Sequence, residues 1–466
     1  MLQVILFSHA KKAIIKYYFE RSFTLSSRDQ FASKIGFILA AAGSAIGLGA
    51  IWKFPYMAGN NGGSVFILLF ILCIFFISLP VLIAEFMIGR RGQKDAITSF
   101  KEQAPGKPWY LIGYMGMIMA ALILSFYSVV GGWILSYLGR ALLFMLSAET
   151  TAYGDLFNAI IQNPFEAVLT QGLFILMTIL IVQAGIKGGI ERASKIMMPA
   201  LFLFFIVLVV RSLTLDGAIE GLRFMFVPNW DYLNGKTILL ALGQAFFTLS
   251  VGVSVMLTYA SYLGKNENIG GAAINVAVMN IIISLLAGLV IFPAVFALGF
   301  SPDQGPGLAF VIIPAVFEQL PMGGFFLILF FILLLFATVT SSISMLEIVV
   351  SIAIGDRKAS RIRTAWIGGF IIFLIGIPSA LSFGVWSHIT ILGKSIFDAV
   401  DFLTNSIGMP IGAFFIALFA GYYYSTHISK QELSTSPPLY YLWLALIRFV
   451  SPVAIAIIFI TSLLAA

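Results

Sequence analysis

The chain has 466 residues, of which 60% are apolar and 10% are charged, and its mean hydropathy is +1.02. Soluble domains carry about 25% charged residues, so this composition excludes a soluble globular protein and indicates a chain that faces lipid. The single cysteine, Cys73, excludes an intramolecular disulfide and a cysteine metal cluster, and the three histidines are far apart in sequence.

Long apolar runs predict eleven membrane-spanning helices, since about 20 apolar residues are needed to cross the hydrocarbon layer. The predicted spans cover residues 34–57, 64–89, 110–141, 165–184, 191–213, 238–263, 270–300, 323–355, 362–384, 395–424 and 438–464. Residues 1–33 precede them as a cytoplasmic segment, and residues 1–27 fit either a genuine extension or a start codon assigned too far upstream. The expected fold class is therefore an all-α integral membrane protein with one transmembrane domain, residues 34–464.

Basic residues are concentrated in segments on one side of these spans, which predicts the orientation of the chain. Lys11, Arg90, Arg91, Lys265 and Arg357 are among them, and all lie inside if the N-terminus is cytoplasmic. We therefore expect a multi-pass protein of the inner (plasma) membrane with its C-terminus outside. The net charge of +7 is then explained by topology and requires no nucleic acid partner.

The first span contains three glycines near its middle, Gly43, Gly47 and Gly49, followed by Lys53. Gly43 and Gly47 alone would fit close helix packing through a small-xxx-small pair. The third glycine and the intramembrane lysine favour a local break in the helix instead. Broken helices expose backbone polar groups, which hydrocarbon tolerates only around a polar cavity, and such breaks mark the binding sites of transporters.

The sixth span, 238–263, has a similar interruption. It places Gln244, Thr248, Ser250 and Ser254 in an apolar run, with Gly252 between the two serines. Spans 1 and 6 open successive groups of five, as an inverted five-plus-five repeat requires. The sequence therefore predicts repeat one over about 34–213, repeat two over about 238–424, and an extra helix over about 438–464.

The eighth span carries a run of hydroxyl side chains between Thr338 and Ser344. Serine and threonine can bond to the backbone of their own helix, so a few hydroxyls would mean little. Thr340 and Ser341 could instead offer oxygen ligands to a hard cation. A cation site in span 8 is the functional interpretation.

Together these stretches resemble the neurotransmitter:sodium symporter family. The resemblance rests on residues 43–55, 246–252, 258–262 and 340–342. Eleven spans are similar to the bacterial branch that imports hydrophobic amino acids. The resemblance implies a sodium-coupled symporter for hydrophobic or aromatic L-amino acids that works by alternating access and is not an enzyme. A membrane sensor of the same fold, which binds an amino acid without moving it, is the alternative.

The resemblance implies two sodium sites. The second site of the family would use carbonyls and hydroxyls of spans 1 and 8, which in this chain belong to Gly43, Ile46, Ala337, Thr340 and Ser341. The first site would combine the substrate carboxylate with Ala45, Thr248 and Asn280. The family often has asparagine where this chain has Ala50, so the number of ions stays open.

The implied substrate is an amino acid, because monoamine carriers of the family place an aspartate where this chain has Gly47. Gly47 leaves room for an α-carboxylate, to which Tyr127 would donate its hydroxyl. The implied substrate-binding residues are Ala45, Gly47, Leu48, Gly49, Ile123, Tyr127, Phe247, Thr248, Ser250, Val253, Met256, Ser341, Ser344 and Met345. Their side-chain pocket is apolar and uncharged.

Two gates are also implied. Lys53 and Asp401 would pair on the outside, and Arg28 with Asp356 on the inside. An unpaired charge within a span costs several kcal/mol, so each needs a partner. Glu85 is expected to have a structural role, tying the N–H groups of span 1 to span 2.

Gly189 and Pro199 would let the inner end of span 5 unwind, although the same pair fits a simple helix start. Chloride dependence stays open. The family's anion site is matched in part by Gln244, Thr248, Asn280 and Ser284, but Phe70 replaces its tyrosine. Besides the substrate, lipid is the only partner that the sequence indicates, and it does not determine an oligomeric state.

Overall fold

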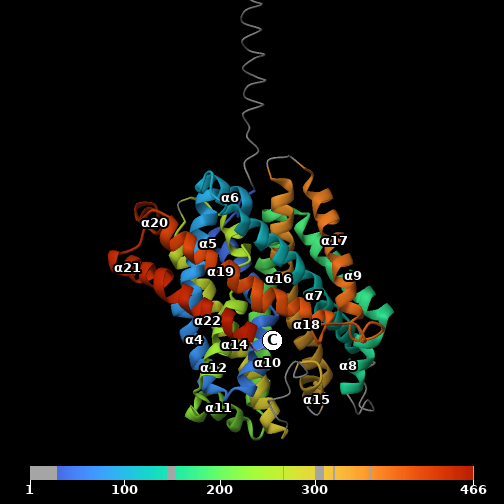
Figure 1. The fold of residues 1–466 in the computed structure, drawn as a ribbon. Coiled ribbons are helices and arrows are strands. Elements are labelled where there is room, and N and C mark those ends of the chain that lie inside the picture. The colour runs from blue at the N-terminus through green and yellow to red at the C-terminus, as the bar shows by residue number, and fades with distance from the viewer. Residues whose placement is uncertain are drawn as a thin grey trace, which may run out of the picture.

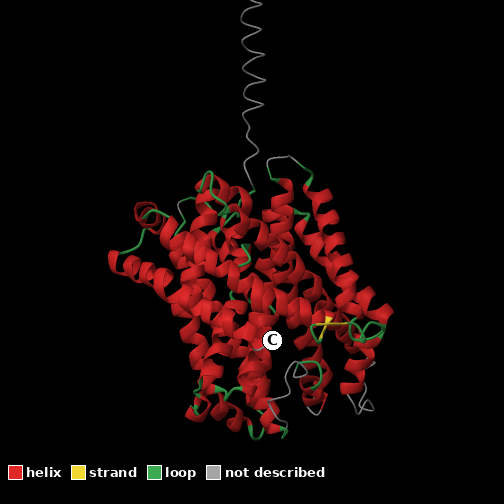
Figure 2. Cartoon of the chain, in the orientation of Figure 1, coloured by secondary structure: helices red, strands yellow, loops and turns green. Residues whose placement is uncertain are grey.

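The computed structural model describes residues 29–143, 153–265, 267–299, 309–318, 321–355 and 359–464. Figure 2 shows that the described chain is helical almost throughout. Its strands form one two-residue hairpin, β1 (Thr390–Ile391) with β2 (Lys394–Ser395). The predicted fold class, an all-helical membrane protein, is confirmed.

Nine helices in the described residues are long and apolar enough to cross a membrane. In chain order they are Ser64–Gly92 (α4, Ser64–Cys73, and α5, Leu79–Gly92), Tyr110–Leu142 (α7), Pro164–Val182 (α9), Ile186–Leu213 (ending in α10, Arg192–Leu213), Ile269–Ala297 (α14), Gly323–Ile354 (α16), Arg361–Leu381 (α17), Ile396–Tyr423 (α18, Ile396–Asp401, and α19, Met409–Leu418) and Pro437–Leu464 (α21, Pro437–Ala445, and α22, Ser451–Leu464). Where two helices share a span, a short π-helical turn joins them.

The first span is broken, as predicted. Helix α2 (Lys34–Ala45) ends, and a π-helical turn, Gly49–Lys53, leads into α3 (Phe54–Asn60) with a bend of 51° between the two halves. Ile46 ends α2 with φ −91° and ψ 70°, outside the helical range. The carbonyls and N–H groups around the bend are therefore released from regular helix bonding.

The predicted span 238–263 is also interrupted. It consists of α12 (Gly235–Thr248) and α13 (Val255–Ala260), and each alone is too short to cross a membrane. Between them Ser250, Gly252 and Ser254 all have positive φ, of 52°, 92° and 56°. Two non-glycine residues in this conformation store strain of about 1–3 kcal/mol each, which typically occurs at functional sites.

Shorter helices cap the two ends of the bundle (Figure 1). Helices α6 (Ala96–Gln103) and α20 (Thr426–Leu433) lie at one end, called the α6 end below. Helices α8 (Tyr153–Gln162), α11 (Ala218–Phe226) and α15 (Ile312–Glu318) lie at the other, called the α11 end. A 3₁₀ turn, Trp230–Tyr232, precedes α12.

Span 5 begins earlier than the predicted residue 191. A π-helical turn, Ile186–Glu191, continues directly into α10, and Gly185 with φ 88° marks its start. A side chain at Gly189 would place its Cβ 2.1 Å from the carbonyl oxygen of Ile181. Only glycine therefore fits at position 189. The turn Ile186–Glu191 is helical in this structure, so the predicted unwinding would be a change away from this conformation.

Candidate functional site

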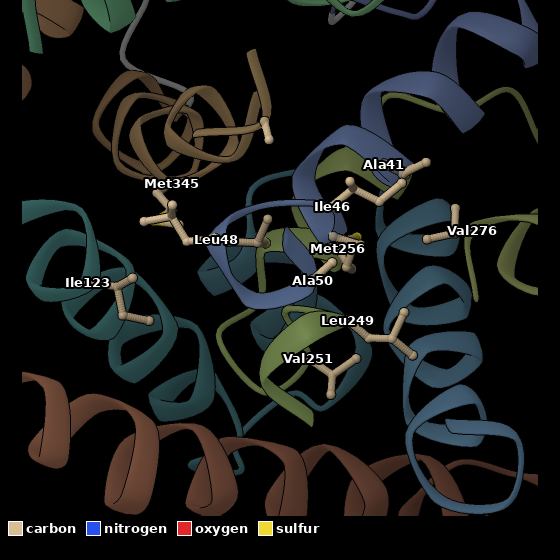
Figure 3. Close-up of a cluster of buried hydrophobic side chains, with 14 of the residues drawn as sticks. Ala41, Ile46, Leu48, Ala50, Ile123, Leu249, Val251, Met256, Val276 and Met345 are labelled. Atoms are coloured by element: carbon tan, nitrogen blue, oxygen red, sulfur yellow. The ribbon is translucent and has the colours of Figure 1, made fainter. Parts of the chain in front are cut away.

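A narrow cavity of about 30 Å³ lies where the two broken spans meet α7 and α16. The lining residues come from five separate segments of the chain. They are Ser44, Ala45, Gly47, Leu48, Gly49, Ile123, Tyr127, Phe247, Ser250, Val253, Val255, Ser341, Ser344, Met345 and Met409. In Figure 3, Ile123 of α7 and Met345 of α16 lie on the same side of Leu48, and all three line the cavity.

All of the predicted substrate-binding residues except Thr248 and Met256 line this cavity. Thr248 turns its hydroxyl to the carbonyl of Gln244 at 3.0 Å, and Met256 is fully buried. Both therefore lie behind the lining in this conformation.

Three lining residues were missed in the sequence: Ser44, Val255 and Met409. Ser44 lies inside the glycine-rich stretch of span 1, so that motif could have suggested it. Met409 begins α19, the part of the tenth span that is apolar on all sides, and no sequence signal indicates which face of α19 points inward.

The absence of a side chain at Gly47 shapes one end of the cavity. A Cβ there would come within 2.4 Å of Ser341 Oγ and 2.6 Å of the Tyr127 hydroxyl. The Tyr127 hydroxyl accepts a hydrogen bond from the Leu48 N–H at 3.2 Å, and its own proton can be donated to the Ser341 or Thr338 oxygen or to a bound acceptor. This end of the cavity can therefore donate to an anionic group.

The rest of the lining is mainly apolar. Ile123, Val253, Val255, Met345 and Met409 contribute branched or flexible hydrocarbon side chains, and none of the lining residues is charged. Methionine adapts its shape to different groups, so the cavity suits apolar side chains of several sizes.

The residues predicted for the second sodium site lie together beside this cavity. Ser341 Oγ donates to the carbonyl of Gly43 at 3.2 Å, and Thr340 Oγ1 donates to that of Ala337 at 3.0 Å. Gly43 also packs against Thr340, since a Cβ at Gly43 would lie 3.0 Å from Thr340 Cβ. These oxygens retain lone pairs, and Ile46 leaves the helix next to them, so the donor set suits a hard cation.

The residues predicted for the first sodium site are joined by one amide. Asn280 Nδ2 donates to the carbonyls of Ala45 at 3.0 Å and Thr248 at 3.2 Å. Asn280 Oδ1 is buried without a hydrogen-bond partner, which is costly unless a ligand satisfies it. Ala50 is fully buried and has no side-chain oxygen to add.

The structure brings only some of the groups of the family's anion site together. Gln244 Nε2 donates to the Gly49 carbonyl at 2.7 Å, while Gln244 Oε1 and Ser284 Oγ are buried without partners. The Phe70 ring packs against Phe54 with 4.8 Å between centroids and offers no donor.

The predicted outer pair is not formed in this conformation. Although both residues are described, no salt bridge joins Lys53 and Asp401. The Lys53 ammonium lies 4.5 Å from the ring centroid of Phe247, and Asp401 accepts a hydrogen bond from Asn405 Nδ2 at 2.5 Å. The charge of Asp401 still acts on Lys53, and the cation–π contact with Phe247 adds a second interaction.

The predicted inner pair, Arg28 with Asp356, lies outside the described residues. At the α6 end the structure instead shows a buried cluster around Glu347. Glu347 accepts hydrogen bonds from the guanidinium of Arg361 and from the Tyr262 hydroxyl, the latter at 2.6 Å. Arg361 Nε also donates to the Val182 carbonyl at 2.9 Å, so this cluster joins α16, α17 and α9 to the turn that follows α13.

Glu85 contacts span 6 rather than span 1, which corrects the expected partner. Its carboxylate is fully buried and accepts hydrogen bonds from the backbone N–H groups of Gly252 at 2.6 Å and Leu257 at 3.2 Å. Because the turn between α12 and α13 is not helical, those N–H groups lack helix partners. Glu85 supplies the missing acceptors.

Glu191 is a further buried acid that the sequence did not single out. It accepts hydrogen bonds from the Ala32 N–H at 2.6 Å and the Ser33 hydroxyl at 2.9 Å, and it pairs with Lys195 at 2.6 Å. Span 5 is thereby attached to the residues that precede α2, including its N-cap Ser33.

Comparison with known proteins gives a consistent result. The model of the sodium:neurotransmitter symporter family matches residues 28–154 and 157–466. The uncharacterised sodium-dependent transporter YhdH of Bacillus subtilis is 51% identical over 441 residues, which are 92% of this chain and 97% of that protein. An uncharacterised sodium-dependent transporter of Haemophilus influenzae is 36% identical over 449 residues, 94% of this chain and 98% of its own length.

A solved structure shares the whole fold. The crystal structure of MhsT in complex with L-phenylalanine superposes with a TM-score of 0.88 and 46% sequence identity, and the match covers 93% of this chain and 100% of that one.

Proposed function

Because the chain belongs to the sodium:neurotransmitter symporter family, we propose that it imports hydrophobic or aromatic L-amino acids together with sodium by alternating access. It is a sodium-dependent membrane transporter and not an enzyme. The substrate class, the ions and the direction of transport are the proposed part.

The observation that carries the substrate class is that position 47 accepts no side chain. A side chain there would collide with Ser341 and Tyr127, so no residue larger than glycine, and no aspartate, fits. The α-carboxylate of an amino acid would occupy this end of the cavity and accept the Tyr127 proton. The apolar lining would hold the side chain, and the binding of L-phenylalanine by MhsT, 46% identical, supports this choice.

Two sodium ions would travel with the substrate. One would bind among the oxygens of Gly43, Ile46, Ala337, Thr340 and Ser341, and the other near Ala45, Thr248 and Asn280. The unpartnered Asn280 Oδ1 supports the second of these positions. Each charge moved inward gains about 2.3 kcal/mol per 100 mV, so two ions would drive steep accumulation.

The α6 end would face the cytoplasm. It carries Arg90 and Arg91, and Lys94 and Lys101 lie on or near α6, which is the basic bias expected inside. Release of Glu191 from Ser33, with unwinding of Ile186–Glu191 near Gly189, would then open the cavity inward.

Proteoliposome uptake tests this proposal. Labelled leucine, phenylalanine, tyrosine and tryptophan are offered with an inward sodium gradient, and with potassium in place of sodium. Accumulation that requires sodium supports the symporter, and replacing chloride by gluconate decides the anion question. Sodium-dependent binding without accumulation or counter-flow would favour the sensor instead.

A further inference from the structure

A groove opens on the outer surface of the bundle, where the first turns of α7 meet α19. Its volume is about 390 Å³, which is much larger than that of the central cavity. The groove is lined by Pro108, Trp109, Leu111, Ile112, Met115 and Phe415. Leu111 is 54% exposed and Phe415 is 42% exposed, although both are apolar. In a membrane protein such a surface faces lipid, so a ligand reaches this groove from the bilayer.

The groove begins at the level of the lipid headgroups. Helix α7 has 33 residues and is therefore about 50 Å long, whereas the hydrocarbon layer is about 30 Å thick. Its first turns consequently reach the headgroup layer at the α6 end. Trp109, Tyr110 and Tyr114 lie in this part of the chain, and tryptophan and tyrosine are enriched at the membrane interface. The groove thus extends from the headgroup layer into the hydrocarbon.

Close packing beneath the groove keeps it open. A Cβ at Gly412 of α19 would collide with the carbonyl oxygen of Gly252 and would lie 3.0 Å from Met115 Cε. A Cβ at Gly116 of α7 would lie 2.7 Å from Ser254 Oγ. Both helices are therefore already in contact with the interrupted part of span 6. Because neither can move closer, the groove is a preformed site and does not close when it is empty.

Two hydrogen-bond donors lie at the headgroup end of the groove. Lys107 directly precedes Pro108, is exposed, and forms no ion pair with any residue that the structure describes. The Trp109 ring packs on Phe419 with 5.3 Å between centroids, which fixes its position. Within the same described ranges, the Trp109 indole N–H has no hydrogen-bond acceptor. A cation and a neutral donor next to an apolar groove match the two parts of a phospholipid.

We propose that this groove binds an anionic phospholipid from the bilayer. One acyl chain lies against Leu111, Met115 and Phe415, and the lipid phosphate accepts hydrogen bonds from Lys107 and Trp109. This inference does not depend on the proposed substrate or ions, because it requires only that the chain lies in a membrane.

The headgroup supplies most of the selectivity. Lipid chains are as apolar as leucine, so an acyl chain gains little by exchanging other lipids for the groove. A single lysine near the membrane surface favours an anionic over a neutral lipid by roughly 5-fold. We therefore expect phosphatidylglycerol to bind about 5-fold more tightly than phosphatidylcholine with the same acyl chains.

Native mass spectrometry of the delipidated full-length protein in detergent tests the headgroup. Dioleoylphosphatidylglycerol and dioleoylphosphatidylcholine are added separately, and the bound molecules are counted. Lys107→Gln should abolish the preference for phosphatidylglycerol. Lys101→Gln is the matched control, because Lys101 is also exposed at the α6 end but does not adjoin the groove lining. A preference that survives in Lys107→Gln would overturn the proposal.

A second pair of variants tests the groove itself. Leu111→Trp should fill the groove and remove the most tightly bound phosphatidylglycerol. Ile118→Trp is the matched control, because Ile118 is 50% exposed on the same face of α7 and lies outside the groove. Equal lipid retention in the two variants would overturn the proposal. A dimer that Leu111→Trp alone converts to a monomer would also overturn it, since a second copy of the chain would then cover the groove.

Fluorescence gives a measurement that does not depend on filling the groove. Phosphatidylglycerol with brominated acyl chains, added in equimolar amount to the delipidated protein, should quench Trp109. Trp109→Phe should abolish this quenching. Trp366→Phe should retain it, because Trp366 is exposed on α17, outside the groove. Quenching that persists in Trp109→Phe would place the lipid elsewhere and overturn the proposal.

Discussion

The carboxylate of Glu191 accepts a hydrogen bond from the hydroxyl of Ser33 at 2.9 Å and thereby attaches span 5 to the N-cap of α2. Its second oxygen accepts the Ala32 N–H at 2.6 Å, and the side chain is 2% exposed. Ser33 Oγ in turn caps α2 by accepting the Gly36 N–H at 3.0 Å. One carboxylate thus fixes the end of the broken first span that must move if the cavity opens toward the α6 end.

Replacing Glu191 by glutamine should loosen this attachment. The amide carries no charge, and hydrogen bonds to a charged group contribute about 1.5–3 kcal/mol each, so stability of the closed form should fall by about 2 kcal/mol. Thermal unfolding would measure the loss of stability. The labelling rate of a cysteine that replaces Ala32 would measure how often this end of the first span detaches from span 5. Glu220→Gln is the control, since its pair with Arg223 is exposed and such pairs contribute little. If the cysteine at position 32 is labelled at the same rate in Glu191→Gln and Glu220→Gln, Glu191 does not hold span 5 to the first span.

Arg361 should be needed mainly because Glu347 is buried. Glu347 is fully buried, and Arg361 is its cationic partner among the described residues. Arg361→Met would leave a buried carboxylate unpaired, at a cost of about 3–5 kcal/mol. The double variant Glu347→Gln, Arg361→Met should recover much of this loss, because no charge remains. Thermal unfolding of the two variants gives the comparison, and a double variant no more stable than the single one would contradict the argument.

The membrane spans could be read from the sequence because hydrocarbon forces apolar runs of nearly fixed length. The break in span 1 could be read for the same reason, since Gly43, Gly47 and Gly49 are unusual in such a run and the structure breaks there. The interruption of span 6 at Gly252 followed from similar signals. These features are local in sequence.

Partners across the bundle could not be read in the same way. Glu85 was expected to contact span 1, but its N–H partners belong to Gly252 and Leu257 in span 6. Lys53 lies over Phe247 and forms no salt bridge with Asp401, although the two charges still interact electrostatically. Each depends on how helices rotate against one another, and a helix that is apolar on every side carries no pattern that fixes its rotation. For this reason the sequence did not predict that Met409 lines the cavity.

Sodium dependence should be sensitive to Thr340. Its hydroxyl lies beside the Ala337 carbonyl and Gly43, and removing one oxygen ligand from a cation is expected to weaken binding by roughly 10- to 100-fold. Thr340→Ala should raise the sodium concentration for half-maximal uptake by about that factor without lowering protein yield. Ser342→Ala, whose hydroxyl faces Thr178, should leave the sodium curve unchanged. An unaltered sodium curve in Thr340→Ala would exclude it as a ligand.

Gly47 offers the sharpest test of the substrate class, because the structure has no space for even a methyl group there. The Cβ of Gly47→Ala would lie 2.4 Å from Ser341 Oγ and 2.6 Å from the Tyr127 hydroxyl, so both must move from the end of the cavity where the carboxylate would bind. Overpacking of this kind costs about 1–3 kcal/mol, which should weaken amino acid binding by roughly 10- to 100-fold.

The matched control for Gly47 is Gly243→Ala in α12. A Cβ at Gly243 meets no atom within 4 Å, and alanine is the better helix former, so this variant should bind as the unaltered protein does. Binding of a labelled amino acid and of its amine analogue, which lacks the carboxylate, is then measured in all three proteins. If Gly47→Ala impairs the amino acid alone, the carboxylate lies at Gly47. Equal loss of both ligands would mean that Gly47 only preserves packing, and the carboxylate would have to bind elsewhere.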